Sequence, residues 1–316
     1  MSKQIIVVFG ATGKQGGSVV SSLLSGSAAG KFHVRGITRD VTKASARALA
    51  SKGAEVVAAD LSDKGSIQQA LKGAYGVYAV TNYWDHRSAD MEFAQGKNIA
   101  DACKEEGIQH LVWSSLLNVT KLSGGVLSQV HHFDSKAKVE EYIRSEGIPA
   151  TFMLPGFYMS NIPGANLRKT PEGTWKLALP IPGDSPIPLL ASEYDTGKFV
   201  KGILLKRDET LGKRIYAATK YYTPLEILAT FKDEYPNAGK DAAFTELPHA
   251  VFKGILAAAG MPEIAQEELL ENMRLMPEFG YYGGEALDSS VAVGLHLPKQ
   301  ILSLILRGSL TTLADR

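Results

Sequence analysis

The sequence contains little cysteine, little net charge and no pattern typical of a metal site. Cys103 is the only cysteine among 316 residues, which excludes a disulfide within the chain and any cysteine-rich metal site. Lysine and arginine number 34 against 33 acidic residues, with no long basic run, so we do not expect direct binding to nucleic acid. The seven histidines form no His-Glu-x-x-His pattern, and no metal site is predicted.

Long apolar runs are also lacking. The run Ile301–Leu306 near the end of the sequence is far too short to span a bilayer. An apolar strand pattern begins within four residues of Met1, which leaves no room for a signal peptide. We therefore expect a soluble protein without a membrane partner, located in the cytoplasm, with the nucleus as an alternative.

The sequence does contain a glycine-rich turn between a buried strand and a helix. The apolar stretch Ile5–Phe9 runs into Gly10-Ala-Thr-Gly-Lys-Gln-Gly-Gly17, and the helical pattern Ser18–Leu24 follows. Glycines permit a tight turn and let backbone N–H groups approach a phosphate at a helix N terminus. The turn therefore predicts a dinucleotide site, whose candidate residues here are Gly10, Thr12, Gly13, Lys14, Gln15 and Gly16. Its Gly-x-x-Gly-x-x-Gly spacing resembles the extended and atypical branches of the short-chain dehydrogenase/reductase superfamily.

Strand and helix patterns alternate as far as residue 155. The expected strands are short and apolar: Gln4–Phe9, His33–Thr38, Glu55–Ala59, Gly76–Thr81, His110–Ser114 and Ala150–Leu154. The expected helices between them are Ser18–Leu24, Lys43–Ser51, Ser66–Leu71, Ser88–Glu106 and Ser128–Ser145. This alternation predicts an α/β fold with a doubly wound parallel Rossmann sheet.

The pattern changes after Pro155, where proline and glycine cluster. We expect a dinucleotide-binding domain over residues 1–155 and a smaller C-terminal α+β region over 156–316 for a substrate or partner, with part of 195–220 returning to the Rossmann sheet. The acidic stretch Glu263–Glu271 is interpreted as the solvated side of a helix. The apolar segment Leu247–Gly260 suits a helix that lines a substrate pocket or packs on a partner.

The residues after the second strand bear on the choice of nicotinamide cofactor. Arg39 follows this strand directly, and Lys43 lies one helical turn beyond. The planar guanidinium of Arg39 suits the extra phosphate of NADP. We predict NADP(H), with NAD(H) as the alternative because Asp40 could bond the adenosine ribose instead.

Further cofactor contacts are expected where the third and fourth strands end. Asp60 and Leu61 follow the third strand, where this fold usually contacts adenine. Thr81 and Asn82 close the fourth strand beside the expected cofactor cleft. Their position at the carboxyl ends of strands is what makes these residues candidates.

The helix expected over Ser128–Ser145 carries the catalytic candidates. Short-chain dehydrogenases have Tyr-x-x-x-Lys there, with the tyrosine as acid or base, whereas this chain has His132-x-x-x-Lys136. The spacing directs both side chains inward, so Lys136 either binds the cofactor or extends to the helix edge. His132 could exchange protons near neutrality or could be a core imidazole. Ser115 stands where the superfamily keeps its oxyanion-polarising hydroxyl.

Together these segments resemble the NmrA-like family, in particular its NADPH-sensor members. The glycine turn, Arg39, Val80-Thr-Asn-Tyr-Trp84 and His132-Phe-Asp-Ser-Lys-Ala-Lys-Val-Glu-Glu-Tyr142 carry the resemblance. It implies an atypical short-chain dehydrogenase fold that binds NADP(H) and lacks the catalytic tyrosine. Members of this type act as redox sensors or transcriptional regulators through protein partners or a change of oligomeric state, and we predict this function, with a protein partner, for this chain.

The same resemblance leaves an enzymatic alternative open. Within the segment 154–161, the family places residues matching Pro155, Tyr158 and Asn161 beside the nicotinamide. Tyr158 could replace the missing acid or could be an aromatic side chain that only lines the cleft. Other relatives are true NADPH reductases. The alternative is therefore an NADPH-dependent oxidoreductase that reduces a small carbonyl, quinone-like or conjugated substrate. Its catalytic candidates would be Lys136, His132, Tyr158 and Ser115.

Overall fold

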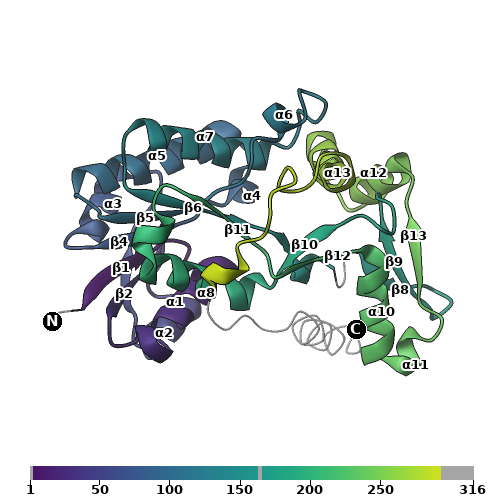
Figure 1. Cartoon of the computed structure of the whole chain (residues 1–316), viewed down its shortest axis with the longest axis horizontal. Helices are drawn as coiled ribbons and strands as arrows, with labels where there is room; N and C mark the ends of the chain where they lie inside the picture. Colours follow the sequence, from purple (N-terminus) through teal and green to yellow (C-terminus); the bar gives the residue numbers. More distant parts are fainter. Residues whose placement is uncertain (1–2, 163–165, 293–316) are drawn as a thin grey trace.

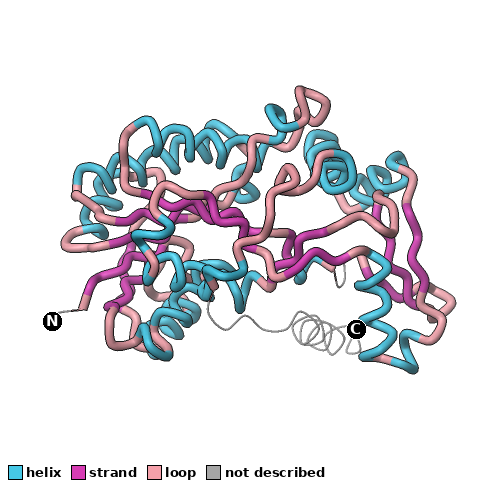
Figure 2. The backbone as a smooth tube through the Cα atoms, viewed as in Figure 1, coloured by secondary structure: helices cyan, strands magenta, loops and turns pink. Residues whose placement is uncertain are grey.

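The central layer of the molecule is a parallel β-sheet, seen in a computed structural model that describes residues 3–162 and 166–292 (Figures 1 and 2). Its strands lie in the order β11-β6-β5-β4-β1-β2-β3. Their bounds are β1 Gln4–Val8, β2 Phe32–Thr38, β3 Glu55–Ala58, β4 Gly76–Ala79, β5 His110–Ser114, β6 Ala150–Pro155 and β11 Arg214–Ala217. Each neighbouring pair is parallel, which confirms the predicted doubly wound sheet.

Helices cover both faces of this sheet (Figure 1). One face carries α1 Lys14–Leu23, α2 Ala44–Ser51 and α8 Ser192–Leu205. The other carries α3 Lys64–Leu71, α5 Ala89–Glu105 and α7 His131–Ser145. Side chains of β1 therefore enter two apolar clusters in alternation, Ile6 and Val8 toward α1 and α8, Val7 toward α3, α5 and α7. Burial on both faces explains why β4, β5 and β6 are largely apolar in the sequence.

Two small sheets and four helices form most of the region beyond β6. One sheet has the order β12-β10-β7 and the other β13-β9-β8. The strands are β7 Phe157–Tyr158, β8 Leu167–Lys169, β9 Trp175–Leu179, β10 Ile187–Leu190, β12 Lys220–Tyr222 and β13 Ala243–Glu246. The helices are α10 Pro224–Glu234, α11 Pro236–Gly239, α12 His249–Ala258 and α13 Glu263–Glu278. Short helical turns complete the described chain: α4 Tyr83–His86, α6 Val119–Leu122, α9 Arg207–Thr210, η1 Gly26–Ala28, η2 Met159–Asn161 and η3 Ser289–Val291.

Two helices begin three or four residues away from the predicted start, and the other three lie within two residues of it. Helix α1 begins at Lys14 rather than Ser18, so it includes Gly16 and Gly17, which are poor helix formers by propensity alone. Helix α7 begins at His131 rather than Ser128, because the backbone before it turns aside and the N–H of Gln129 donates to Glu271 at 2.6 Å. Tertiary contacts therefore set both starts.

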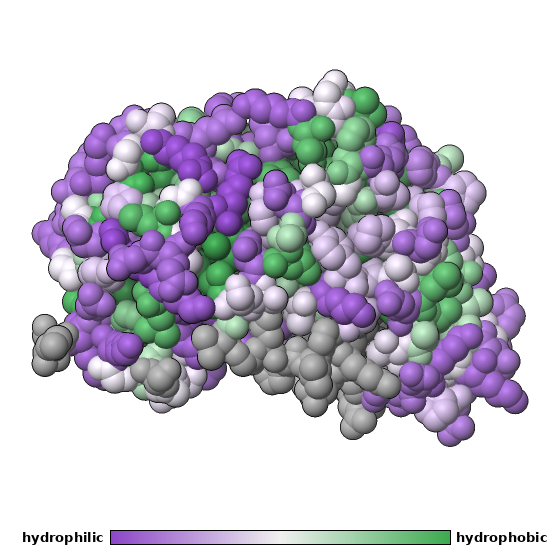
Figure 3. Space-filling view, in the orientation of Figure 1, coloured by the Kyte–Doolittle hydropathy of each residue, from purple (hydrophilic) through white to green (hydrophobic). Residues whose placement is uncertain are grey.

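Helix α13 corrects the interpretation of the acidic stretch. Glu268 and Glu271 are only 1% and 6% exposed, so this part of the helix is not a solvated face. The neighbouring helix α12 has no buried residue. The apolar side chains Val251 and Ile255 of α12 and Ile264 of α13 are exposed. Figure 3 shows that this face of the molecule is largely hydrophilic, with separate hydrophobic areas.

A membrane span is not present among residues 3–162 and 166–292, where no helix is both long and apolar enough to cross a bilayer. The apolar run Ile301–Leu306 lies outside the described residues.

Candidate functional site

One cavity of about 1220 Å³ lies at the carboxyl ends of the central strands and continues into the smaller region. This edge is where open α/β sheets bind ligands. The predicted cofactor residues all line it: Gly10, Thr12, Gly13, Lys14, Gln15, Gly16, Arg39, Lys43, Asp60, Leu61, Thr81, Asn82, Lys136, Pro155, Tyr158 and Asn161. Of the other two catalytic candidates, His132 lines the cavity as well and Ser115 does not.

The glycine turn at one end of the cavity has the geometry of an anion site. Gly10 has a φ of +63°, a conformation that side chains disfavour. A Cβ on Gly16 would lie 2.2 Å from the Gly10 carbonyl oxygen, so only glycine permits this close approach of helix to strand. No side chain caps the N terminus of α1 at Gly13. Its first N–H groups and helix dipole can therefore hold a phosphate, and this end of the cavity fits a dinucleotide.

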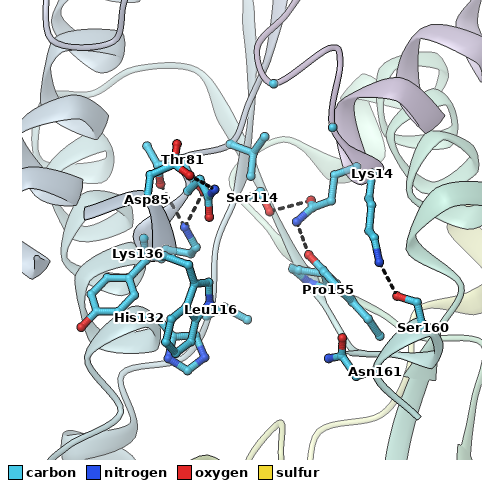
Figure 4. A pocket seen from close by; sticks show the side chains of 18 of the residues that line it. Lys14, Thr81, Asp85, Ser114, Leu116, His132, Lys136, Pro155, Ser160 and Asn161 are labelled. Carbon is cyan, nitrogen blue, oxygen red and sulfur yellow. Dashed lines mark hydrogen bonds between the residues drawn. The ribbon is translucent and has the colours of Figure 1, made fainter. Parts of the chain in front are cut away.

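Two side chains of α1 connect the glycine turn to the strands and the smaller region (Figure 4). The amide oxygen of Gln15 accepts from Ser114 Oγ at 3.0 Å and from the Tyr78 hydroxyl, and its Nε2 donates to the Tyr158 hydroxyl. Lys14 Nζ donates to Ser160 Oγ at 2.8 Å. These bonds fix the wall of the cavity around the expected nicotinamide position.

The two residues that follow β2 place the cation Arg39 and the carboxylate of Asp40 at the part of the cavity where the adenosine is expected. Arg39 has a side chain 70% exposed and an Nη2 atom 3.5 Å from Asp85 Oδ2. The carboxylate of Asp40 is instead held by its own loop, accepting from the hydroxyl and the N–H of Thr42 at 2.6 and 2.8 Å. These bonds lower the pKa of Asp40. One oxygen of the Asp40 carboxylate is therefore held by its own loop, and Arg39 and Asp40 both line the cavity.

The hydroxyl that faces the cavity belongs to Ser114 and not to Ser115, which corrects the sequence assignment. Ser115 Oγ donates to Glu140 at 2.6 Å on the buried side of the chain. Ser114 lines the cavity and donates to Gln15. Successive residues of a strand point to opposite faces, so an error of one residue reverses the side chain's direction.

Lys136 is almost fully buried, and each of its three N–H groups has an acceptor. Nζ donates to the carbonyl and hydroxyl oxygens of Thr81 at 3.0 and 2.9 Å and forms an ion pair with Glu92. Glu92, 2% exposed, also accepts from Thr81 Oγ1 at 2.7 Å and from Ser135. Sequence reasoning missed Glu92. A signal for Glu92 was present in the sequence, because it shares one face of α5 with buried residues: Gln95, Gly96, Ile99 and Cys103. An acidic side chain on a buried face needs a cation as its partner.

His132 is held by the buried carboxylate of Glu268 on α13. Glu268 Oε1 accepts from the backbone N–H and from Nδ1 of His132, both at 2.7 Å, and Oε2 accepts from the Tyr83 hydroxyl at 3.0 Å. Burial and the Glu268 charge raise the pKa of Tyr83, so this phenol is a neutral donor. Glu268 was also missed. The acidic residues around Glu268 favoured a solvent-facing helix. The sequence offered no signal for its partner His132, which lies 136 residues away.

Tyr158 lies in the cavity wall without a lysine to activate it. Burial is the main cause that raises its pKa to about 12. The amine of Lys136 donates to Thr81 and Glu92 instead, and Figure 4 shows Lys136 on the opposite side of the cavity from Pro155 and Asn161. The arrangement differs from the Tyr-x-x-x-Lys pair of working short-chain dehydrogenases.

Part of the cavity wall in the smaller region is apolar, while Asn166, Arg168, Thr170 and Lys176 of that region also line the cavity. We call the apolar part the apolar lobe. Side chains of α12, α13 and the segments after them supply it: Phe252, Ile255, Leu256, Met261, Met273 and Tyr281. His132 lies beside this lobe, with its ring centroid 5.1 Å from that of Trp84. One cavity therefore combines an anion-binding end, an imidazole and a large apolar space.

Comparison with known proteins identifies the family. The NmrA-like family matches residues 2–298 of this chain. The NmrA-like family domain-containing oxidoreductase malD of Malbranchea aurantiaca is 37% identical over 235 residues, 69% of this chain and 69% of that protein. The similarly named oxidoreductase cpsB of Aspergillus campestris is 30% identical over 309 residues, 92% of this chain and 88% of that protein.

Solved structures share the fold. NmrA, a negative transcriptional regulator, in complex with NAD has a TM-score of 0.83 at 21% identity and covers 99% of this chain and 98% of its own. Its complex with NADP has a TM-score of 0.81 at 22% identity, with coverage of 100% and 98%. The family match across nearly the whole sequence confirms the resemblance seen in the motifs. The chain belongs to the NmrA-like family.

Proposed function

We propose that this protein is an NADP(H)-dependent reductase whose substrate is a flat, largely apolar molecule with a carbonyl or conjugated group. The observation that carries this proposal is the single cavity that joins the glycine turn to the apolar lobe, with His132 and Lys136 between them. A dinucleotide alone would not require the apolar lobe. The two fungal relatives described above are named as oxidoreductases, and these names support the same function.

The cofactor would be held by residues that follow β1 and β2, at the carboxyl ends of these strands. The N terminus of α1 would bind the pyrophosphate, and Arg39 with Lys43 would bind the extra phosphate of NADP. NADP(H) is proposed over NAD(H) because two cations, Arg39 and Lys43, line this part of the cavity, while one oxygen of Asp40 already accepts from Thr42. NmrA was crystallised with each of the two cofactors, so preference has to be measured for this chain.

The chain's own residues would position the reactants. A bound reduced nicotinamide supplies a hydride to the substrate. Pro155, Tyr158 and Asn161 form the wall opposite Lys136, and they would set the face that the nicotinamide presents. The apolar lobe would exclude water and hold the substrate against that face.

A regulatory role is the second candidate, and one observation favours it. Lys136 already uses all three N–H groups on Thr81 and Glu92, as expected for a structural or sensing lysine. The exposed apolar side chains Val251 and Ile255 of α12 would suit a protein partner or a second copy of the chain. Cofactor occupancy would then change association instead of supporting turnover.

NADPH oxidation with a panel of aromatic aldehydes, quinones and conjugated ketones separates the two candidates. The reductase proposal predicts saturable turnover that depends on both reactants. Calorimetry without substrate should show NADPH binding in either case. Tight NADPH binding with no turnover across the panel, together with association that changes with NADPH, would replace the reductase by the regulatory role.

A further inference from the structure

We propose that His132 and Glu268 form an acid pair that protonates the substrate. Nε2 of His132 donates the proton, and Glu268 positions and charges the imidazole through Nδ1. This inference rests on the proposed reductase function and names the proton donor of that site. It assigns to the histidine of His132-x-x-x-Lys136 the role that tyrosine has in other short-chain dehydrogenases.

The orientation of the imidazole is fixed. Nδ1 lies 2.7 Å from Glu268 Oε1, which directs the other ring nitrogen away from that carboxylate. The rings of Trp84 and Phe133 contact the imidazole, with centroids 5.1 and 4.9 Å from the His132 centroid. His132 lines the cavity, and within residues 3–162 and 166–292 its Nε2 has no hydrogen-bond partner. A substrate oxygen in the cavity would be the natural acceptor.

The charge on Glu268 requires a cation. Its side chain is 2% exposed, and none of the described lysines or arginines lies within ion-pair distance. The backbone N–H and the Tyr83 phenol are neutral donors, and a buried carboxylate with neutral donors alone is costly. In the acid pair that we propose, a doubly protonated imidazole at 2.7 Å would provide this positive charge. The same protonated form is the one that can act as an acid.

The other candidates in the cavity are less suited to give up a proton. Burial raises the pKa of Tyr158 to about 12, and its hydroxyl is bound to Gln15. The N–H groups of Lys136 are engaged with Thr81 and Glu92. His132 is therefore the donor that is both oriented and open to the cavity.

The pair is assembled across the two parts of the molecule. His132 lies on α7 beside the central sheet, and Glu268 lies on α13 next to the apolar lobe. Helix α13 also receives the Gln129 N–H on Glu271, one turn after Glu268. The acid pair therefore exists only when α13 packs against the start of α7.

The proton step balances as follows for an aldehyde. The hydride brings one hydrogen and two electrons to the carbonyl carbon, and the π pair of the C=O bond moves to oxygen. This oxygen takes the proton from Nε2, which leaves a primary alcohol and a neutral imidazole. His132 then regains a proton from solvent.

Two probe substrates separate proton delivery from hydride delivery. 2-Naphthaldehyde needs both a hydride and a proton. Crystal violet, a triarylmethyl cation, needs only a hydride to become its neutral leuco form. His132→Gln should lower kcat for 2-naphthaldehyde about a hundredfold, the usual contribution of a general acid, and leave reduction of crystal violet unchanged. Glu268→Gln, which keeps the shape but removes the charge, should give a smaller loss with the same selectivity.

Glu271→Gln is the matched control. Glu271 is a buried carboxylate on the same helix, but it bonds to the Gln129 N–H and does not contact His132. Its replacement should change neither rate. Equal losses for both probes in His132→Gln would show a structural role and overturn the proposal, as would full aldehyde turnover in that variant.

The wild-type result separates the proposal from the function on which it rests. If wild type reduces crystal violet alone, the reductase function stands and the acid pair is wrong. If it reduces neither probe, both fail. If wild type reduces only the aldehyde, the NADPH affinity of His132→Gln, measured by calorimetry, replaces the dye as the control. A fall in this affinity that matches the loss of rate overturns the proposal.

A spectroscopic test needs neither cofactor nor substrate. In ¹⁵N-labelled wild-type protein, His132 should show a strongly hydrogen-bonded Nδ1–H, and Glu268→Gln should weaken this signal while Glu271→Gln preserves it. A signal that stays unchanged in Glu268→Gln would contradict the pairing of charge that we propose.

Discussion

At the scale of single residues, two carboxylates that are almost fully buried hold the histidine and the lysine of the site. Glu92 pairs with Lys136 and Glu268 with His132. Each pair joins helices far apart in the sequence, so periodicity predicts that the faces are buried but not which charges meet. The motif His132-x-x-x-Lys136 could therefore be recognised from the sequence, whereas the groups that define its chemistry could not.

Removing Glu92 should destabilise the fold. Glu92→Ala leaves the Lys136 ammonium buried without its counter-charge, and breaking such a pair lowers the free energy of unfolding by about 3 to 5 kcal/mol. Urea denaturation measures this change. Glu141→Ala is the control because Glu141 forms an exposed ion pair with Lys121, with side chains 52% and 68% exposed respectively. This substitution should lower the free energy of unfolding by less than about 1 kcal/mol. Equal small losses for the two variants would mean that the buried pair is not formed.

Arg39 should determine cofactor preference. A charge-assisted contact with the extra phosphate contributes about 1.5 to 3 kcal/mol, so Arg39→Ala should weaken NADPH about ten- to a hundredfold and NADH little. Calorimetry with the two cofactors measures both affinities. Lys52→Ala, an exposed cation at the end of α2, should affect neither. Equal losses for NADPH and NADH in Arg39→Ala would remove this residue from the phosphate site.

At the scale of elements, the central strands β4, β5 and β6 were predictable because all their residues are buried, and the outer strands β2 and β3 because they keep apolar residues between polar ones. Strands β1 to β6 lie within one or two residues of their expected bounds. Details that depend on tertiary contact were not predictable. The assignment of the cavity hydroxyl to Ser115 failed by one residue, and the start of α7 moved because Gln129 bonds to Glu271.

His110 on strand β5 should make the free energy of unfolding decrease at acidic pH. Burial, with a smaller contribution from Arg207, lowers the pKa of His110 to about 4. Between about pH 6.5 and 4 the unfolded chain therefore binds more protons at this residue than the folded chain, and stability falls as pH falls through that window, by about 1.4 kcal/mol per pKa unit of the shift. Urea denaturation at several pH values should show a shallower fall in His110→Gln than in wild type. Identical pH slopes would contradict a neutral buried His110.

At the scale of the whole molecule, the site belongs to neither part alone. The central sheet provides the anion-binding end, and α12 and α13 provide the apolar lobe. The anion-binding end could be predicted because its glycine turn, between a strand and a helix, is continuous in the sequence. The apolar lobe arises from segments between residues 247 and 281 that meet only in the folded chain, so sequence suggested a pocket-lining helix without showing what it faces.

Transfer of deuterium tests the central claim most directly. Protein, 2-naphthaldehyde and NADPH carrying deuterium on one face of the nicotinamide C4 are incubated, and the alcohol is analysed by mass spectrometry for both stereoisomers of the labelled cofactor. The account predicts one deuterium on the carbinol carbon from one labelled face and none from the other, because the cavity wall presents a single face to the apolar lobe. Unlabelled product from both, or no product while calorimetry shows NADPH bound, would contradict it.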